Sequence, residues 1–277
     1  MGSVHMDFMT EFFSWNFTRE PEGLFSWQHL AMVTSAFALA AFLAFRLSAK
    51  VAGKDRAAKM RVVVVAAIVL DGLELIKLVN YCLITGSLRI LLNYLPLFLC
   101  SIPLIVLPVA AFAKGRIQQA SLDFVMMFGL LGAILGTYLA GNIYSIFPVL
   151  HFDPMISLAT HMTSGFAALY IGLSGLGTLE KRNRWIGIAI LGVFMATAFV
   201  VDKIGHVAGF QDNYMFLTRS DGTPFMILEN VFGAGTALYT LSVALCMWLY
   251  MGVFHLTADA FANMKHRTKP VATRLRP

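Results

Sequence analysis

Two residues of this sequence carry side chains suited to nucleophilic chemistry, Cys100 and His161. Cys100 stands between Pro96 and Pro103 in the apolar run NYLPLFLCSIPLIVLP at 93–108. The thiolate is the reactive form of cysteine, and a nearby imidazole can take the thiol proton and return it to a leaving alcohol. The pair therefore predicts acyl transfer or acyl hydrolysis through a thioester, although no spacing rule links the two residues.

Other polar residues within the apolar segments are candidates to support such a pair. Ionisable groups inside a membrane are costly, so each one is a candidate functional group. A carboxylate, Glu74 or Asp202, could orient the imidazole, and a cation or amide could stabilise an oxyanion or bind a headgroup phosphate. The supporting or substrate-binding candidates are His29, Glu74, Lys77, Asn80, Asn142, Asp202, His206 and Asn213.

Some of these residues also have structural explanations. Glu74 and Lys77 are three residues apart on a predicted helix and can simply neutralise each other. Asp202 and His206, four residues apart, can form a salt bridge at the rim of the site. His29 opens a predicted helix and can act as a cap or an interfacial anchor. Both explanations stay open for each of these residues.

The prolines around Cys100 predict where its helix is interrupted. A proline inside a helix removes one N–H and crowds the carbonyl four residues earlier. Pro96 thus frees the carbonyl of Leu92, and Pro103 frees that of Leu99. In hydrocarbon, such loosened backbone persists only where protein or a wet cavity satisfies it. We therefore expect a distorted transmembrane helix with the thiol at its distortion.

The composition is that of a polytopic membrane protein. The 277 residues are 58% hydrophobic and 13% charged, about half the roughly 25% charged residues of soluble proteins. Several apolar runs reach the roughly 17–25 residues that cross a bilayer. The sequence predicts an all-α bundle of seven transmembrane helices, at about 28–46, 62–83, 91–113, 122–147, 154–176, 185–207 and 230–254.

The positive charges predict the orientation of these spans. Most of the 21 lysine and arginine residues fall in the loops after the first, third and fifth spans and in the tail. Basic short loops stay cytoplasmic, so the N-terminus is expected outside and the C-terminus inside. In this topology Cys100, His161 and almost every other intramembrane polar group fall in the outer half of the bilayer. They predict a polar cavity that opens outward.

One domain is expected over residues 1–277, with an extracellular segment at 1–24 and a basic cytoplasmic tail at 255–277. The net charge of +6 is explained by membrane topology rather than by nucleic-acid binding. The three cysteines show no metal-ligand spacing and imply no disulfide framework, and Cys82 and Cys246 are expected to be packing residues. No cofactor or metal is expected.

Five short motifs occur in an order that resembles a known family. They are LFSWQHL at 24–30, LPLFLC at 95–100, FGLLGA at 128–133, THM around His161 and DNYMFL at 212–217. Together they resemble the YwaF-like bacterial integral membrane proteins, whose eukaryotic relative is transmembrane protein 164. The resemblance covers residues 24–254.

This resemblance implies a seven-span protein that acts on phospholipids through an acyl-cysteine. The family is similar to the androgen-induced hydrolases, which pair a threonine nucleophile with a histidine. The family cysteine corresponds to Cys100 and the family histidine to His161, while His29 falls in the SWQH motif and Asn213 in the NYMFL motif. Many members carry a polar residue two positions before the cysteine, where this chain has Phe98.

The sequence leaves three functions open. The first is a lipid acyltransferase or acyl hydrolase in the cell membrane, with membrane phospholipids as its partners. The second is a transporter or ligand-binding protein that uses the same outer cavity. The third is a zinc lipid hydrolase, which needs histidine and carboxylate side chains to converge on one metal; the histidines His29, His161 and His206 with Asp202 would have to do so. The oligomeric state is not predicted.

Overall fold

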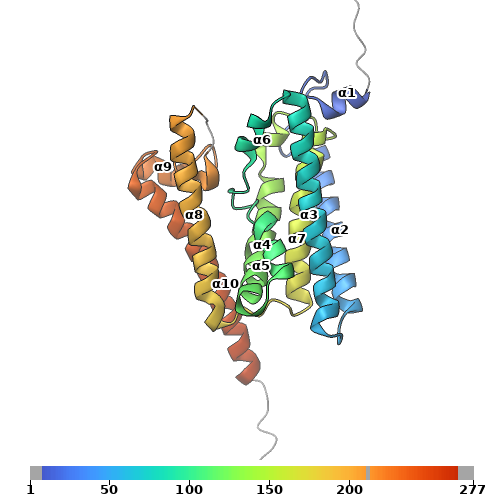
Figure 1. Cartoon of the computed structure of the whole chain (residues 1–277), viewed down its shortest axis with the longest axis vertical. Helices are drawn as coiled ribbons and strands as arrows, with labels where there is room; N and C mark the ends of the chain where they lie inside the picture. Colours follow the sequence, from blue (N-terminus) through green and yellow to red (C-terminus); the bar gives the residue numbers. More distant parts are fainter. Residues whose placement is uncertain (1–7, 210–212, 268–277) are drawn as a thin grey trace, which may run out of the picture. The chain divides into compact units, whose positions relative to one another are not determined.

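The computed structural model describes residues 8–209 and 213–267, and the side chains up to residue 260. These residues form helices and no strand, which confirms the predicted all-α class (Figure 1). The long helices are α2 (Trp27–Lys50), α3 (Arg56–Thr85), α5 (Gly115–Tyr138), α7 (Phe152–Leu173), α8 (Arg184–Val207) and α10 (Ala237–Arg267). The short elements are α1 (Phe8–Phe13), α4 (Pro103–Phe112), α6 (Gly141–Tyr144), α9 (Met226–Phe232) and the 3₁₀ turns Leu88–Tyr94, Lys181–Asn183 and Tyr214–Phe216.

Local sequence explains where α2 and α3 begin and end. The Ser26 hydroxyl accepts a hydrogen bond from the backbone N–H of His29 at 3.2 Å and caps α2. The Asp55 carboxylate accepts one from the N–H of Ala58 at 2.9 Å and caps α3. Such caps satisfy donors that the first helical turn leaves free. Gly86 ends α3 in the left-handed region, with φ of 62°, which favours glycine.

Five helical segments are long and apolar enough to cross a membrane. They are Trp27–Lys50, Gly115–Tyr144, Phe152–Leu173, Lys181–Val207 and Ala237–Ala260. The chain is thus a multi-pass helical membrane protein, while the predicted count of seven spans and the orientation of the termini stay predictions. The second predicted span, 62–83, falls within α3, which is long enough to cross but carries Asp71, Glu74 and Lys77 in its apolar stretch.

The third and seventh predicted spans are not single helices. Residues 91–113 form the end of the 3₁₀ turn Leu88–Tyr94, an irregular segment at 95–102 and the ten-residue helix α4. Two prolines seven residues apart each remove a backbone donor, so no continuous helical ladder bridges them. The predicted span 230–254 is divided between α9 and α10, with Gly233 at φ of 82° and Gly235 at φ of 71° in the break.

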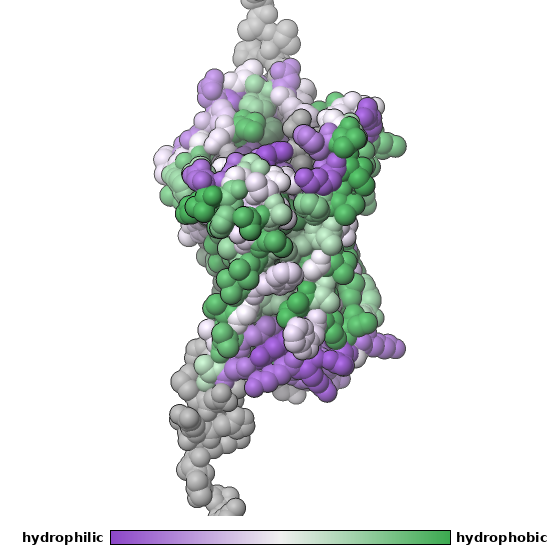
Figure 2. Space-filling view, turned by 90° about the vertical axis from the view of Figure 1, so that its left-hand side faces the viewer, coloured by the Kyte–Doolittle hydropathy of each residue, from purple (hydrophilic) through white to green (hydrophobic). Residues whose placement is uncertain are grey.

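Apolar side chains on the long helices are left at the surface, as lipid contact requires. On α2 the exposed fractions of Leu39, Phe42 and Phe45 are 58%, 57% and 62%. Figure 2 shows hydrophobic side chains over much of the visible helical surface, with hydrophilic side chains gathered toward the helix ends.

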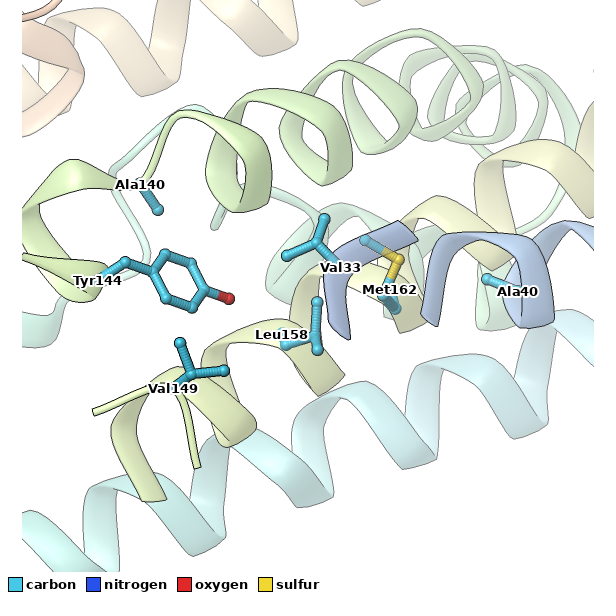
Figure 3. Close-up of a cluster of buried hydrophobic side chains, with 7 residues drawn as sticks. All are labelled: Val33, Ala40, Ala140, Tyr144, Val149, Leu158 and Met162. Atoms are coloured by element: carbon cyan, nitrogen blue, oxygen red, sulfur yellow. The ribbon is translucent and has the colours of Figure 1, made fainter. Parts of the chain in front are cut away.

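The helices α5 and α7 form the packed centre of the first part of the chain. A cluster of buried apolar residues joins α2, the α5–α6 junction and α7, with the Tyr144 ring among its members (Figure 3). Small residues let α5 and α7 approach closely: a Cβ at Gly165 would lie 2.6 Å from the Cβ of Ala133. Close approach at small residues is typical of helix pairs in membranes.

The chain divides into two compact units. One comprises residues 1–178 and 182–215, and the other comprises 179–181 and 216–277. In the second unit, the Tyr239 hydroxyl of α10 donates to the carbonyl of Phe216 at 2.9 Å, and the Thr240 hydroxyl donates to that of Leu217 at 2.7 Å. This division does not test the prediction of a single domain. The predicted cytoplasmic position of the basic tail is not tested either, and residues 268–277 of that tail lie outside the described residues.

Candidate functional site

Cys100 lies on irregular backbone between a 3₁₀ turn and α4. The N–H groups of Ser101 and Ile102 both donate to the carbonyl of Phe98, at 2.8 and 3.1 Å, and form a turn around Cys100. Helix α4 then begins at Pro103, where a proline costs no hydrogen bond. The thiol is therefore carried by a turn inside the apolar part of the chain, and its side chain is half-buried.

Tyr214 holds this turn from a distant part of the sequence. Its phenol donates to the carbonyl of Leu92 at 2.8 Å and accepts from the N–H of Leu95 at 3.2 Å. Leu92 is the residue whose carbonyl Pro96 was expected to free. The ring also packs on Phe98, with centroids 4.9 Å apart. Protein groups thus satisfy the loosened backbone, as an apolar environment requires.

Replacing Tyr214 by phenylalanine is expected to loosen the turn before Cys100. The change leaves the carbonyl of Leu92 without its donor, which costs about 1–3 kcal/mol when such a group is buried. Amide exchange at Leu95 should accelerate, because its N–H loses the phenol oxygen, and the free energy of unfolding should fall. Tyr138→Phe, which removes one exposed contact of 3.0 Å with Thr34, should change neither quantity measurably.

The prediction fails if amide exchange at Leu95 is the same in the Tyr214→Phe variant and the original protein. That result would mean that the turn before Cys100 is held by its own internal hydrogen bonds.

Two glycines of α5 form the wall against which the candidate pair lies. A Cβ added at Gly132 would lie 3.1 Å from both Cα and Cβ of Cys100. A Cβ added at Gly136 would overlap the Nε2 and Cδ2 atoms of His161. The two glycines are four residues apart, so they lie on one face of α5 in successive turns. Cys100 and His161 therefore pack against successive turns of the same face of α5.

The hydrogen bonds of His161 assign a task to each ring nitrogen. Nδ1 lies 2.7 Å from the carbonyl oxygen of Ser157, which can only accept, so Nδ1 carries the proton. The Ser157 hydroxyl is 3.4 Å from the same nitrogen. Nε2 is then an acceptor, and it is buried without a regular hydrogen bond in the described part of the chain. The backbone thus orients the imidazole with its basic nitrogen free.

The thiol of Cys100 is the side chain that faces this free nitrogen. The two groups interact as a side-chain pair, but Nε2 closes no hydrogen bond of regular geometry. Contacts of this kind are often loose in empty sites and tighten only when a substrate is bound. A thiol beside a basic nitrogen is the pairing that nucleophilic catalysis needs.

Lys77 is the nearby cation of this site. Its ammonium acts electrostatically on both Cys100 and His161. It lies 2.7 Å from the Glu74 carboxylate and 5.5 Å from the centroid of the Tyr94 ring. The two side chains of the ion pair are largely covered, with exposed fractions of 18% for Lys77 and 13% for Glu74. The structure therefore pairs Lys77 with Glu74 beside the ring of Tyr94.

The remaining predicted site residues have other surroundings. The His29 ring accepts from the N–H of Phe25 at 3.1 Å and donates to the carbonyl of Thr137 at 3.0 Å, so it ties α2 to α5. The Asn80 amide donates to the carbonyl of Phe13 at 3.2 Å. Both side chains are engaged by backbone groups and hold the fold together.

Asp202 belongs to the support of Tyr214. It is buried, with an exposed fraction of 3%, and accepts from the N–H of Tyr214 at 2.8 Å. Asn213, next to Tyr214, is equally buried. Asn142 and His206 are exposed, and Asp212 of the DNYMFL motif lies outside the described residues. The orienting group for His161 is thus the Ser157 carbonyl rather than the Asp202 carboxylate.

A buried polar network beside the site was missed by the sequence analysis. The Tyr81 hydroxyl donates to the Asp153 carboxylate at 2.5 Å, and His151 lies 3.3 Å from the same carboxylate. The Tyr81 ring packs on Tyr94, with centroids 4.6 Å apart, which connects this network to the ring under Lys77. The HFDP sequence at 151–154, which forms the N-cap and the first turn of α7, was the available signal.

Within the described residues, no group of three or more histidine, cysteine, aspartate or glutamate side chains lies close enough to hold a metal ion. The zinc hypothesis therefore lacks a ligand set in this part of the chain. His29 and Asp202, two of its proposed ligands, are engaged by backbone groups elsewhere.

Comparison with known proteins gives one match. The sequence model of the TMEM164 family matches residues 24–254, which cover all the residues of the site described above. No curated protein and no solved structure matches the chain significantly.

Proposed function

Because the chain belongs to the TMEM164 family, we propose that it is a membrane-embedded lipid acyltransferase or acyl hydrolase in which Cys100 is the nucleophile and His161 the base. The observation that carries the proposal is the pair itself. His161 is oriented by a backbone carbonyl, its Nε2 is buried without a regular hydrogen bond, and it faces a thiol on an irregular turn. A buried acceptor is costly to leave unsatisfied, so a functional reason for it is expected.

The first half-reaction forms an acyl thioester. His161 Nε2 takes the proton of the Cys100 thiol, and the thiolate attacks the carbonyl carbon of a phospholipid ester. A carbon–sulfur bond forms and the ester carbon–oxygen bond breaks. The imidazolium returns its proton to the departing alkoxide, which leaves as the alcohol of a lysophospholipid. The Lys77 ammonium can stabilise the negative charge that develops on the carbonyl oxygen.

The second half-reaction releases the acyl group. His161 Nε2 takes a proton from an incoming alcohol or water, whose oxygen attacks the thioester carbonyl. The carbon–sulfur bond breaks, and the thiolate recovers the proton from the imidazolium. An alcohol acceptor makes the protein a transferase, whereas water makes it a hydrolase.

We propose further that the site opens to the outer leaflet of the cell membrane. This rests on a seven-span topology with the N-terminus outside. In it, α3 and the broken segment 88–112 also cross the membrane, in addition to the five apolar helical segments. In support, Glu74 and Lys77 lie in the half of α3 that the topology places outside. In the same topology, the turn with Cys100 lies in the outer half of the bilayer, toward the level of the phospholipid ester groups.

The test is intact-protein mass spectrometry of the purified chain after incubation with phospholipids. The original protein should gain the mass of a fatty acyl group, and neutral hydroxylamine should remove it. Cys100→Ala should gain nothing, while Cys82→Ala should behave like the original protein. An adduct that persists in Cys100→Ala would refute the thioester. No adduct with any phospholipid would instead favour transport, with Glu74 and Lys77 as the residues to change.

Lys77→Gln is expected to lower the rate of acyl-adduct formation about tenfold. The effect should be smaller than the roughly 10²–10³-fold loss of a dedicated oxyanion donor, because Glu74 shares the charge of Lys77. The rate is followed by mass spectrometry, with Glu74→Gln/Lys77→Gln as the second variant. A double variant as slow as the single one shows that Lys77 acts on the substrate. Recovery to within twofold of the original rate would show that Lys77 only neutralises Glu74.

A further inference from the structure

An apolar groove runs between α2, α3 and α7, on elements of one compact unit. Its volume is about 430 Å³, within the roughly 300–1,000 Å³ of small-molecule sites. Leu39 and Leu43 of α2 and Val65 and Val69 of α3 form its walls, while Phe166 of α7 contributes to its floor. The wall residues are 41–58% exposed, so the groove is open to the surroundings of the helices, which are lipid in a membrane protein.

Arg61 is the charged residue that lines this groove. In the part of the chain that the structure describes, its guanidinium makes no hydrogen bond or ion pair. Two basic neighbours in the sequence do form hydrogen bonds within the protein. Lys59 donates to the carbonyl of Ser174 at 2.8 Å, and Arg56 donates to the side chains of Gln118 and Gln119. Arg61 is therefore a positive charge at an apolar groove that the protein itself does not neutralise.

The position of the groove separates it from the candidate active site. Arg61 and Lys77 are sixteen residues apart on α3, about 24 Å at 1.5 Å per residue. From Arg61 to Val69 the groove follows α3 for about 12 Å. This is less than half of the roughly 30 Å hydrocarbon thickness. The groove thus lies within the leaflet that meets the α2–α3 connection, and one acyl chain from that leaflet fits its length and chemistry.

We infer that this groove binds one acyl chain of an anionic phospholipid, with the lipid phosphate on Arg61. A phospholipid is the expected occupant, because the exposed wall residues open the groove to the lipid of the leaflet and the Arg61 guanidinium can pair with a phosphate. The end of α2 and the α2–α3 connection add the basic residues Lys50 and Lys54 near the same end of the groove. Basic clusters beside a membrane span are typical anionic-lipid sites. The inference is independent of the chemistry proposed at Cys100.

The probe is a phosphatidylglycerol with a photoreactive diazirine in one acyl chain, added to the full chain in phosphatidylcholine nanodiscs. After illumination, labelled peptides are located by mass spectrometry. Label should concentrate on groove residues of α2, α3 and α7, and unlabelled phosphatidylglycerol should displace it while phosphatidylcholine does not. Equal displacement by both lipids, or label spread evenly over the helices, would overturn the inference. Displacement by oleic acid but not by phosphatidylglycerol would overturn it too.

Matched variants test the two parts of the site. Arg61→Gln should reduce groove labelling about fivefold, as expected for one basic residue at a membrane surface, while Lys54→Gln should change it less than twofold. Val65→Phe should block the groove, whereas Ile68→Phe, on exposed surface outside the groove, should not. Equal losses within either pair would contradict the assigned site. If a variant folds poorly, displacement of the label by phosphatidylglycerol on the original protein still tests whether the groove binds an anionic phospholipid.

Discussion

Gly136→Ala is expected to slow acyl-adduct formation by at least about 100-fold while the helix bundle stays folded. The added methyl would overlap the Nε2 side of the His161 ring, and the ring cannot shift without losing its bond to the Ser157 carbonyl. A displacement of about 1 Å at a catalytic group can cost about 100-fold in rate. The backbone itself should gain, because alanine is a better helix former than glycine by about 1 kcal/mol.

The measurement pairs the rate of adduct formation with thermal unfolding of the purified protein. Gly72→Ala on α3 is the matched control, because nothing lies within 4 Å of the methyl it adds. That variant should keep the rate within twofold. If Gly136→Ala also reacts at the original rate, the imidazole does not need its present position, and the role proposed for His161 is wrong.

The sequence predicted a similar depth for Cys100 and His161 rather than their contact. Membrane spans are roughly parallel, so the depth of a residue in its span limits which residues of other spans it can meet. The prolines around Cys100 predicted broken backbone, and the structure has an irregular turn there. The break is larger than expected, because Pro96 and Pro103 act on adjacent turns and leave only the ten residues of α4 helical.

The wall of the site could not be predicted in the same way. Gly132 and Gly136 matter because they leave space beside α5 where a side chain would otherwise lie. A glycine in the sequence does not indicate which residue will fill that space. Their spacing on one helix face was visible, but it is equally typical of plain helix packing in membranes. Only the structure shows that Cys100 and His161 occupy the space that the two glycines leave.

The roles of His29 and Asp202 also required the structure. Both were candidates for chemistry because ionisable groups are rare in apolar segments. Their partners are backbone groups: the carbonyl of Thr137 for His29 and the N–H of Tyr214 for Asp202. Every residue has a backbone carbonyl, and every residue except proline has an N–H, so no sequence pattern marks the ones that a side chain will use. Buried polar residues with structural roles therefore look like site residues in a sequence.

His161→Asn is the variant that separates the base from the structural role of the histidine. The asparagine amide can replace Nδ1 as donor to the Ser157 carbonyl, but it offers no basic nitrogen at the position of Nε2. Acyl-adduct formation should fall by about 10²–10⁴-fold, the typical contribution of a general base. The thermal unfolding temperature should change little, since the buried donor is kept. His161→Gln should be as slow, because its amide is not a base either.

The control is His206→Asn, which changes an exposed histidine of α8 and should leave the rate unaltered. A His161→Asn protein that reacts within twofold of the original rate would assign His161 to structure alone, and the thiol of Cys100 would then need another proton acceptor. If acyl-adduct formation is slow in both His161→Asn and Gly136→Ala, the two results have one common explanation. The first variant removes the basic nitrogen, and the second only moves it. That agreement would tie the chemistry to the position of Nε2.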